Sequence, residues 1–174
     1  MSDKLLMFMD LFQKWNQRIN LSAATTRDEL QEHLDDSLHV VPVLEGCTRV
    51  LDVGSGGGFP VVIAAISLPG SHFVSLEPVH KKHAFLRTAA RELALPNLEP
   101  LSERLEDHAG HDYDAAMSRA TFDLGEWLRL GRERVRAGGL VIGFEAQPRN
   151  EISGERVPYE LRGKPRSLVL QRVP

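Results

Sequence analysis

Apolar residues near the start of the chain recur at spacings of three and four, which is the period of an amphipathic helix. One such stripe covers residues 5–19, and a second covers residues 30–41. Thr26 followed by Glu29 has the spacing of a capping box, in which two side chains satisfy backbone N–H groups at a helix start. The pattern predicts a helical lead over residues 1–45, packed on the rest of the chain.

After the lead, the apolar positions fall into short runs rich in β-branched residues, separated by longer stretches of helical period. Strands that alternate with helices are typical of a parallel sheet, because each parallel pair needs a crossover connection. We predict the α/β class, with a doubly wound, mostly parallel sheet of seven strands. The expected strands are 48–53, 72–77, one within 98–107, 113–118, 140–145 and a final hairpin that includes 167–173; the expected helices are 60–68, 80–93 and 122–135, and a linker-like piece spans 146–158.

Length and composition fit one structural unit made of the lead and residues 46–174. The chain has 174 residues, of which 42% are hydrophobic and 26% charged, as is ordinary for a soluble globular protein. No apolar run approaches a membrane span, and acidic residues stand where a signal peptide would be basic. We therefore expect a cytoplasmic protein without a membrane partner.

The cysteine count and the net charge limit which disulfides, metal sites and nucleic-acid surfaces the chain can form. The single cysteine, Cys47, excludes an internal disulfide and a site with several cysteine ligands, and we expect no metal. The net charge is −3, so the molecule as a whole is not a polycation. A basic face can still sit on an acidic body, so a nucleic-acid partner remains open.

Glycines cluster in LDVGSGGGFPVVIAA, residues 51–65, between a predicted strand and a predicted helix. There, backbone N–H groups and a helix N-terminus can meet a nucleotide-like ligand. A dinucleotide fingerprint would need its third glycine at position 59, which is Phe59, and a Walker loop would need a Gly-Lys-Ser/Thr that is absent. The spacing is instead D-x-G-x-G-x-G, which resembles motif I of the class I S-adenosylmethionine methyltransferases. Its members are Asp52, Gly54, Gly56 and Gly58.

Glu77 follows the next predicted strand, at the end of FVSLE. An acidic residue at this place in the fold can meet a ribose, and one carboxylate accepts hydrogen bonds from both ribose hydroxyls. By itself Glu77 would be a solvated surface carboxylate. Beside the glycine segment, it is predicted to bind a ribose.

Six segments together resemble the glucose-inhibited division protein B family (RsmG), the bacterial methyltransferases that modify N7 of a guanine in small-subunit ribosomal RNA. They occur in the order and spacing of that family, and the similarity runs from about residue 14 to residue 147. The segments are KWNQRINLSA (14–23), HLDDSL (33–38), DVGSGGGFP (52–60), KKHAFL (81–86), SERLED (102–107) and SRA (118–120).

The resemblance implies a Rossmann-like class I methyltransferase that uses S-adenosylmethionine and acts on 16S ribosomal RNA or the small ribosomal subunit; we expect a monomer. Guanine N7 has a free lone pair and loses no proton on methylation, so the reaction needs alignment and a dry pocket rather than a general base. The implied cofactor-binding residues are Gly54, Phe59, Leu105, Glu106 and Arg119, which Gly56, Gly58 and Glu77 join from the general motif.

Arg119 follows the predicted strand 113–118, at the sheet edge where ligands of α/β folds gather. It could hold the methionine carboxylate, an RNA phosphate or guanine O6, or be a plain surface arginine. It cannot use the familiar fork to O6 and N7 together, because N7 must stay free to attack. We expect it to position a reactant.

Contacts with RNA must come from local basic groups. The expected RNA-binding residues are Lys81, Lys82, Arg104 and Arg119, and residues 154–174 add five basic residues against two acidic ones. Glu145 stands where the family pattern carries a lysine near the site, and its charge would repel a phosphate. Either Arg149 or Lys164 takes over that contact, or the target differs.

Three other functions stay open at this point. A small-molecule methyltransferase would use the lead helices as a lid over a closed apolar pocket. A non-catalytic cofactor-binding module would have kept the glycine segment and lost turnover, for which Glu145 is the warning sign. An NAD-dependent oxidoreductase is disfavoured by the glycine spacing.

Overall fold

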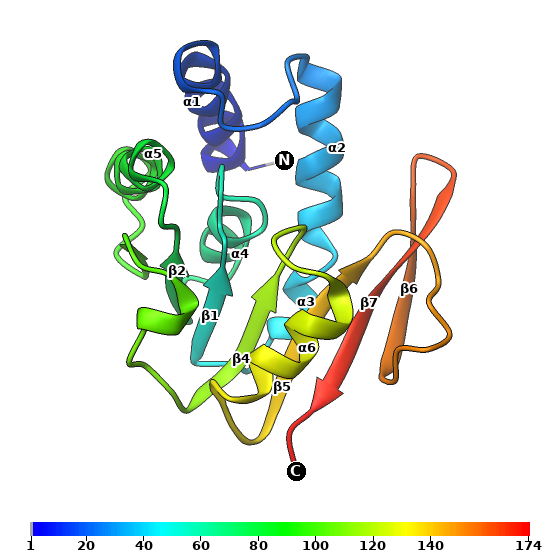
Figure 1. Cartoon of the computed structure of the whole chain (residues 1–174). Coiled ribbons are helices and arrows are strands. Elements are labelled where there is room, and N and C mark those ends of the chain that lie inside the picture. The colour runs from blue at the N-terminus through cyan, green and yellow to red at the C-terminus, as the bar shows by residue number, and fades with distance from the viewer. Residues whose placement is uncertain (1) are drawn as a thin grey trace.

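The computed structural model describes residues 2–174 as a sheet with helices on both faces (Figure 1). The helices are α1 (Asp3–Ile19), α2 (Arg27–Leu38), α3 (Val41–Leu44), α4 (Val61–Ser67), α5 (His80–Glu92) and α6 (Leu124–Arg132), with a short 3₁₀ turn, η1 (Leu105–Asp107). The strands are β1 (Arg49–Val53), β2 (His72–Leu76), β3 (Leu98–Leu101), β4 (Tyr113–Ser118), β5 (Val135–Glu145), β6 (Glu155–Leu161) and β7 (Lys164–Arg172).

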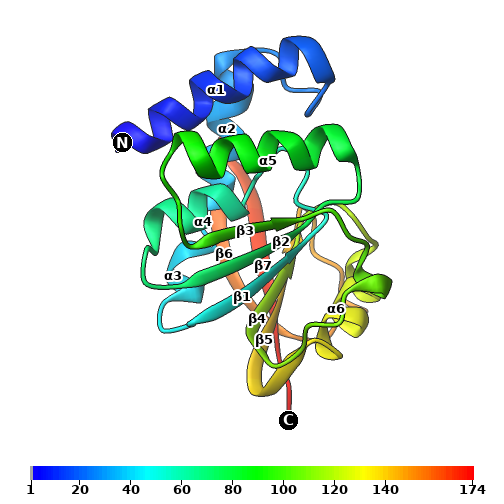
Figure 2. The same ribbon diagram turned by 90° about the vertical axis from the view of Figure 1, so that its left-hand side faces the viewer.

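The seven strands form one sheet in the order β3-β2-β1-β4-β5-β7-β6. The first five strands are parallel, and β7 runs antiparallel to both of its neighbours. Helices α1, α4 and α5 stack on one side of the sheet and α6 lies on the other (Figure 2). The predicted fold class is confirmed: a doubly wound, mostly parallel sheet of seven strands.

The strand order brings the candidate residues to one edge of the sheet. In parallel strands all carboxyl ends point the same way, and ligands of open α/β folds bind outside those ends. The glycine segment follows β1, Glu77 follows β2, Arg119 follows β4 and Glu145 ends β5. Residues up to 91 positions apart in sequence, Gly54 and Glu145, therefore share one edge.

The lead belongs to the same apolar core as the sheet. An aromatic cluster joins α1 to the glycine segment and α5: the Phe59 ring lies 5.1 Å from the ring of Phe8 and 5.3 Å from that of Phe12, and Phe85 packs on both helical rings. The predicted capping box is also present, with Thr26 and Glu29 bonding to each other's backbone N–H groups. The lead thus covers the segment that follows β1.

Three predicted boundaries were wrong. The stripe of residues 30–41 is split, because Pro42 has no N–H group to bond the carbonyl of Leu38, where α2 ends. The predicted helix 122–135 stops at Arg132, and the chain enters β5 at Val135, which pairs with β4. The predicted linker 146–158 contains the start of β6.

Candidate functional site

The three motif glycines after β1 all adopt positive φ angles, which favour glycine: 72° at Gly54, 54° at Gly56 and 89° at Gly58. They differ in what surrounds them. A Cβ atom at Gly54 would collide with the Thr121 side chain, and one at Gly58 would collide with Val62, so these two serve close packing. A Cβ at Gly56 would meet only the Gly54 carbonyl oxygen, at 3.9 Å, so Gly56 faces open space.

Glu77 is buried and its carboxylate holds this segment. One oxygen accepts a hydrogen bond from the Gly56 N–H at 2.7 Å and the other accepts one from the Val79 N–H at 2.9 Å. Each carboxylate oxygen has a further lone pair for another donor. The structure therefore places the predicted ribose acceptor directly against the glycine that faces open space.

A cavity of about 430 Å³ lies above this segment and below the lead. Gly56 and Glu77 form its floor with Phe59, and Arg119 and Lys82 contribute basic side chains. It also contains Gly54, while Gly58 packs away from it against Leu86 and Phe8. Most of the predicted cofactor-binding residues are thus brought together around one cavity of suitable chemistry.

Asp52 lies at the end of β1 with its carboxyl group fully buried. Burial raises the pKa of Asp52 to about 7, although Ser55 and the charge of Arg119 act in the opposite direction. Within residues 2–174 its Oδ2 atom has no hydrogen-bond partner. A cation nearby would favour the ionised form, but the side chain of Asp52 lines neither cavity.

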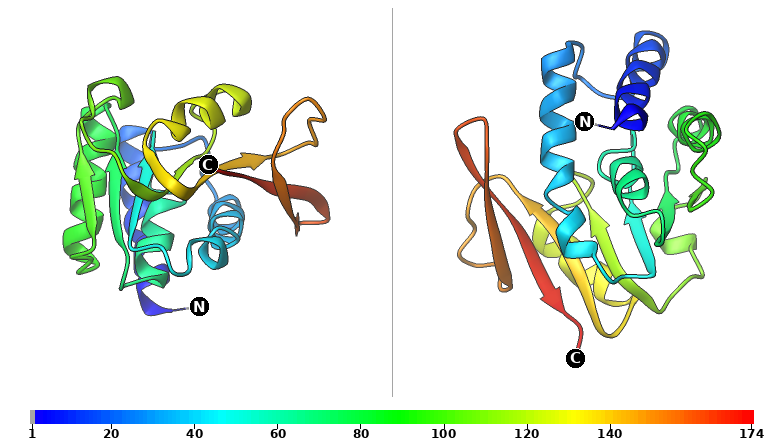
Figure 3. Two further views of the ribbon diagram at one scale, coloured as in Figure 1. Left: turned by 90° about the horizontal axis from the view of Figure 1, so that it is seen from below. Right: turned by 180° about the vertical axis from the view of Figure 1, so that it is seen from behind.

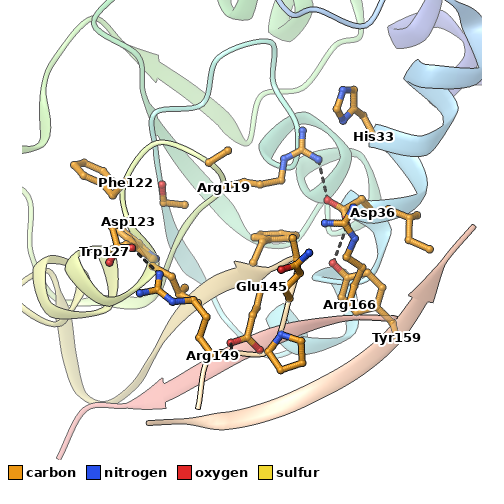
Figure 4. A pocket seen from close by; sticks show the side chains of 18 of the residues that line it. His33, Asp36, Arg119, Phe122, Asp123, Trp127, Glu145, Arg149, Tyr159 and Arg166 are labelled. Carbon is orange, nitrogen blue, oxygen red and sulfur yellow. Dashed lines mark hydrogen bonds and ion pairs between the residues drawn. The ribbon is translucent and has the colours of Figure 1, made fainter. Parts of the chain in front are cut away.

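A second cavity, of about 680 Å³, adjoins the first (Figure 4). One wall carries Phe122 and Trp127 from the α6 side, and the opposite wall carries Asp36, Tyr159 and Arg166 from α2 and the β6–β7 hairpin. Figure 3 shows α2 running beside that hairpin. The two cavities share His33, Arg119 and Ala120, so they meet where the chain leaves β4.

Arg119 is held at this junction from two directions. Its guanidinium donates to Asp36 Oδ2 at 3.0 Å and lies 5.8 Å from the centre of the Phe59 ring. The other oxygen of Asp36 accepts from the Tyr159 hydroxyl at 2.6 Å, which ties α2 to β6. Burial and this hydrogen bond raise the pKa of Tyr159. Arg119 is therefore oriented between the cavities rather than free on the surface.

His33 lines both cavities. Burial, and then the charge of Arg119, lowers the pKa of His33, so its imidazole is neutral at neutral pH. The ring lies 5.6 Å from that of Phe59. His33 is thus a neutral, packed imidazole beside both cavities and not a cation.

Leu105 and Glu106 line neither cavity. The Leu105 side chain is buried in the core beneath η1, so only its backbone can face a ligand, and its carbonyl accepts from Arg134 at 2.9 Å. Glu106 is exposed, 3.9 Å from Arg104. Their assignment to a cofactor site, and that of Arg104 to RNA, stay predictions.

The two lysines at the start of α5 differ in exposure and in direction. Lys81 is exposed, as an RNA contact requires, whereas Lys82 is half-buried and lines the 430 Å³ cavity. The two side chains were expected to act together on RNA. The two side chains differ in direction because neighbouring residues of a helix face different sides, and the assignment of both lysines to RNA stays a prediction.

Glu145 does not present a free negative charge to the second cavity. It is buried, and its carboxylate accepts hydrogen bonds from Arg156, from Ser167 and from the backbone N–H of Arg149. Burial raises its pKa, but these bonds outweigh that effect and hold the pKa of Glu145 below its usual value. The expected repulsion of phosphate is thus largely neutralised. Of the two proposed replacements, Arg149 lines the cavity and Lys164 does not.

Two side chains of this site, Asp36 and Tyr159, were not identified from the sequence as functional. Arg166 was expected to contact RNA only as one of the five basic residues of the tail, 154–174. Alternation along a β hairpin could have placed Tyr159 and Arg166 on one face, since they are cross-strand partners. Nothing local links them to Asp36.

Two kinds of feature are absent from residues 2–174. No helix there is both long and apolar enough to cross a membrane. That part of the chain also contains no cluster of three or more histidine, cysteine, aspartate or glutamate side chains arranged to hold a metal ion.

Comparison with known proteins gives a family and a fold. The model of a family described as rRNA small subunit methyltransferase G matches residues 1–170. Ribosomal RNA small subunit methyltransferase G of Chromobacterium violaceum is 38% identical over 149 residues, covering 84% of this chain and 71% of that protein. The protein of the same name from Neisseria gonorrhoeae is 37% identical over 161 residues, covering 91% and 77%.

Solved structures resemble the chain in fold alone. Cofactor-bound Rv0187 from MTB has a TM-score of 0.67 at 17% identity, with 99% of this chain and 90% of that chain covered. The O-methyltransferase TomG from Streptomyces achromogenes, in complex with SAM, has a TM-score of 0.66 at 15% identity and the same coverage.

Proposed function

The chain belongs to the rRNA small subunit methyltransferase G family, and on that basis we propose that it methylates N7 of a guanine in 16S ribosomal RNA. It is an S-adenosylmethionine-dependent methyltransferase, and it acts in the cytoplasm as a monomer. The observation that carries the proposal is the junction of the two cavities at Arg119 and Ala120. A methyl donor in one cavity and a base in the other would meet there.

The residues of the smaller cavity fit S-adenosylmethionine. When bound, this cofactor supplies an activated methyl group on a sulfonium. Gly56 leaves room for close approach to the backbone, and Glu77 has lone pairs free for the ribose hydroxyls. We assign Phe59, Gly54 and Lys82 to the surroundings of the same ligand.

The larger cavity fits a flipped guanine with part of its strand. Phe122, Leu124, Trp127 and Phe144 give it an apolar wall that excludes water from the base. The side chains need only align the reactants, because N7 attacks through its own lone pair and releases no proton. Arg119 contacts guanine O6 or a phosphate from the junction and leaves N7 free.

Salt dependence tests this proposal against a small-molecule methyltransferase. We expect the apparent affinity for small-subunit ribosomal RNA to fall with salt, with a log–log slope of about −3 if about four phosphates are neutralised, at about −0.7 for each. Contacts at Arg119, Lys81, Arg104 and the basic tail would supply them. The measurement is methyl transfer at low and moderate salt. A flat affinity, or transfer to a small acceptor and to no RNA, would contradict the proposal.

A further inference from the structure

Every carboxylate that lines the 680 Å³ cavity is paired with an arginine, and each has a different one. Asp36 pairs with Arg119 at 3.0 Å, and Asp123 with Arg149 at 2.6 Å. Glu145 pairs with Arg156 at 3.2 Å, and Glu32 pairs with Arg162 at 3.6 Å. The acidic lining of the cavity is therefore neutralised without any contribution from Arg166.

Arg166 is the arginine of this cavity that has no acidic partner within residues 2–174. It lines the same cavity, and within residues 2–174 its side chain forms no hydrogen bond or ion pair; its Nε atom is buried without a partner. Asp36 lies on the same wall, and its carboxylate accepts hydrogen bonds from Arg119 and from Tyr159 but not from Arg166 (Figure 4). A partly buried charge without a partner is costly, so this position favours an anion.

The sheet register places Arg166 where a ligand can reach it. The last paired residues of β5 and β7 are Glu145 and Ser167, so Arg166 lies just past the carboxyl end of β5. Its cross-strand partner is Tyr159, whose hydroxyl bonds to Asp36. Asp36 and Tyr159 thus stand between Arg166 and the Arg119 junction, and a base at the junction leaves Arg166 free for another group of the same strand.

We propose that Arg166 binds a backbone phosphate of the RNA strand next to the guanine being methylated, and so supplies the cation missing at position 145. A guanidinium offers a planar fork of N–H donors that matches phosphate geometry, and phosphate is the anionic group of a ribonucleotide. Arg149, by contrast, is engaged by Asp123 and Glu151. The inference rests on the proposed function, because it takes RNA as the occupant of the cavity.

The test compares Arg166→Ala, Arg166→Lys and the control Arg129→Ala. Arg129 is an exposed arginine of α6, so its loss changes the net charge equally without touching the cavity. Binding of small-subunit ribosomal RNA from cells that lack the gene is measured against salt, with S-adenosylhomocysteine present. Cofactor affinity, melting temperature and binding of inorganic phosphate alone are measured in parallel.

We expect Arg166→Ala to weaken RNA binding about tenfold, the scale of one charge-assisted hydrogen bond, and to make the log–log slope shallower by about 0.7. Arg166→Lys should keep the slope and recover part of the affinity. Cofactor affinity and the slope of Arg129→Ala should match the unmodified chain. The melting temperature of Arg166→Ala should not fall, because no bond within the protein is lost.

Four results would overturn the inference: an unchanged slope for Arg166→Ala, an equal loss in Arg129→Ala, a loss of cofactor binding, or Arg166-dependent binding of inorganic phosphate with RNA binding unaffected. The binding measurement also separates this inference from the proposed function. RNA binding that depends on Arg166 without any methyl transfer would support the inference and contradict the function. Absence of RNA binding by the unmodified chain would overturn both.

Discussion

Gly56→Ala is expected to abolish binding of S-adenosylmethionine, lowering its affinity by at least about 100-fold, or about 2.8 kcal/mol. The added methyl group would enter the 430 Å³ cavity, because a Cβ at this position meets no side chain and points into open space. It would then occupy the place where the ligand approaches the backbone. Calorimetric titration with S-adenosylmethionine and with S-adenosylhomocysteine measures the effect.

The matched control for this variant is Gly46→Ala. Gly46 also has a positive φ angle, 84°, and open space around its Cβ position, but it lies before β1, away from both cavities. Both substitutions carry backbone strain of about 1 kcal/mol, so both should lower the melting temperature by similar small amounts. Cofactor affinity should be lost only at Gly56. Tight binding by Gly56→Ala would remove the glycine segment from the cofactor site.

Glu77→Gln is expected to weaken cofactor binding by roughly 10- to 150-fold, the range of about 1.5–3 kcal/mol for hydrogen bonds to a charged group. Both carboxylate oxygens accept from backbone N–H groups, of Gly56 and Val79. An amide must turn its NH₂ group toward one of these donors, so it disturbs the loop as well as the ribose contact. The dissociation constant is measured by calorimetry.

Glu99→Gln serves as the control for the lost charge. Glu99 is an exposed carboxylate of β3, the strand beside β2, and its side chain contacts His72 at 2.8 Å. The control should bind S-adenosylmethionine as the unmodified chain does. If Glu77→Gln also bound it within about twofold of the unmodified chain, or 0.4 kcal/mol at about 1.4 kcal/mol per tenfold, Glu77 would be a purely structural carboxylate.

The fold, and the gathering of most candidate cofactor residues around one cavity, could be predicted because their signals are local. The glycine spacing and Glu77 each follow directly on an apolar strand, and parallel strands bring their carboxyl ends to one edge whatever the details of packing. The sequence could not show which of the three glycines serves close packing within the protein and which one leaves room for a ligand. Gly54 and Gly58 accommodate Thr121 and Val62, and only the tertiary structure leaves Gly56 open.

The substrate side depended on pairings between distant residues. Arg119 bonds to Asp36 across 83 positions, and Tyr159 bonds to the same carboxylate across 123. That Arg166 is unpaired follows only after every other arginine of the cavity has been assigned a partner. Sequence reasoning counted the tail arginines as one basic group, because charge alone does not show which of them are neutralised.

Glu145 shows that the sequence alone also does not reveal whether an acidic residue is neutralised by a partner. Compared with the family pattern, it looked like a repulsive charge near the substrate. In the fold it is a buried acceptor that joins β5 to β6 and β7 through Arg156 and Ser167. The negative charge of Glu145 is therefore paired with Arg156, which comes from β6, the strand beyond β7 in the sheet.

The most direct test of the central claim is a map of N7-methylguanosine in small-subunit ribosomal RNA from three strains: one with the gene, one without it, and one carrying Gly56→Ala. We expect one guanine to be methylated at N7 in the first strain and unmethylated in the other two, with the rest of the map unchanged. The same N7-methylguanosine in all three strains would contradict the assignment of this chain as the enzyme that places it.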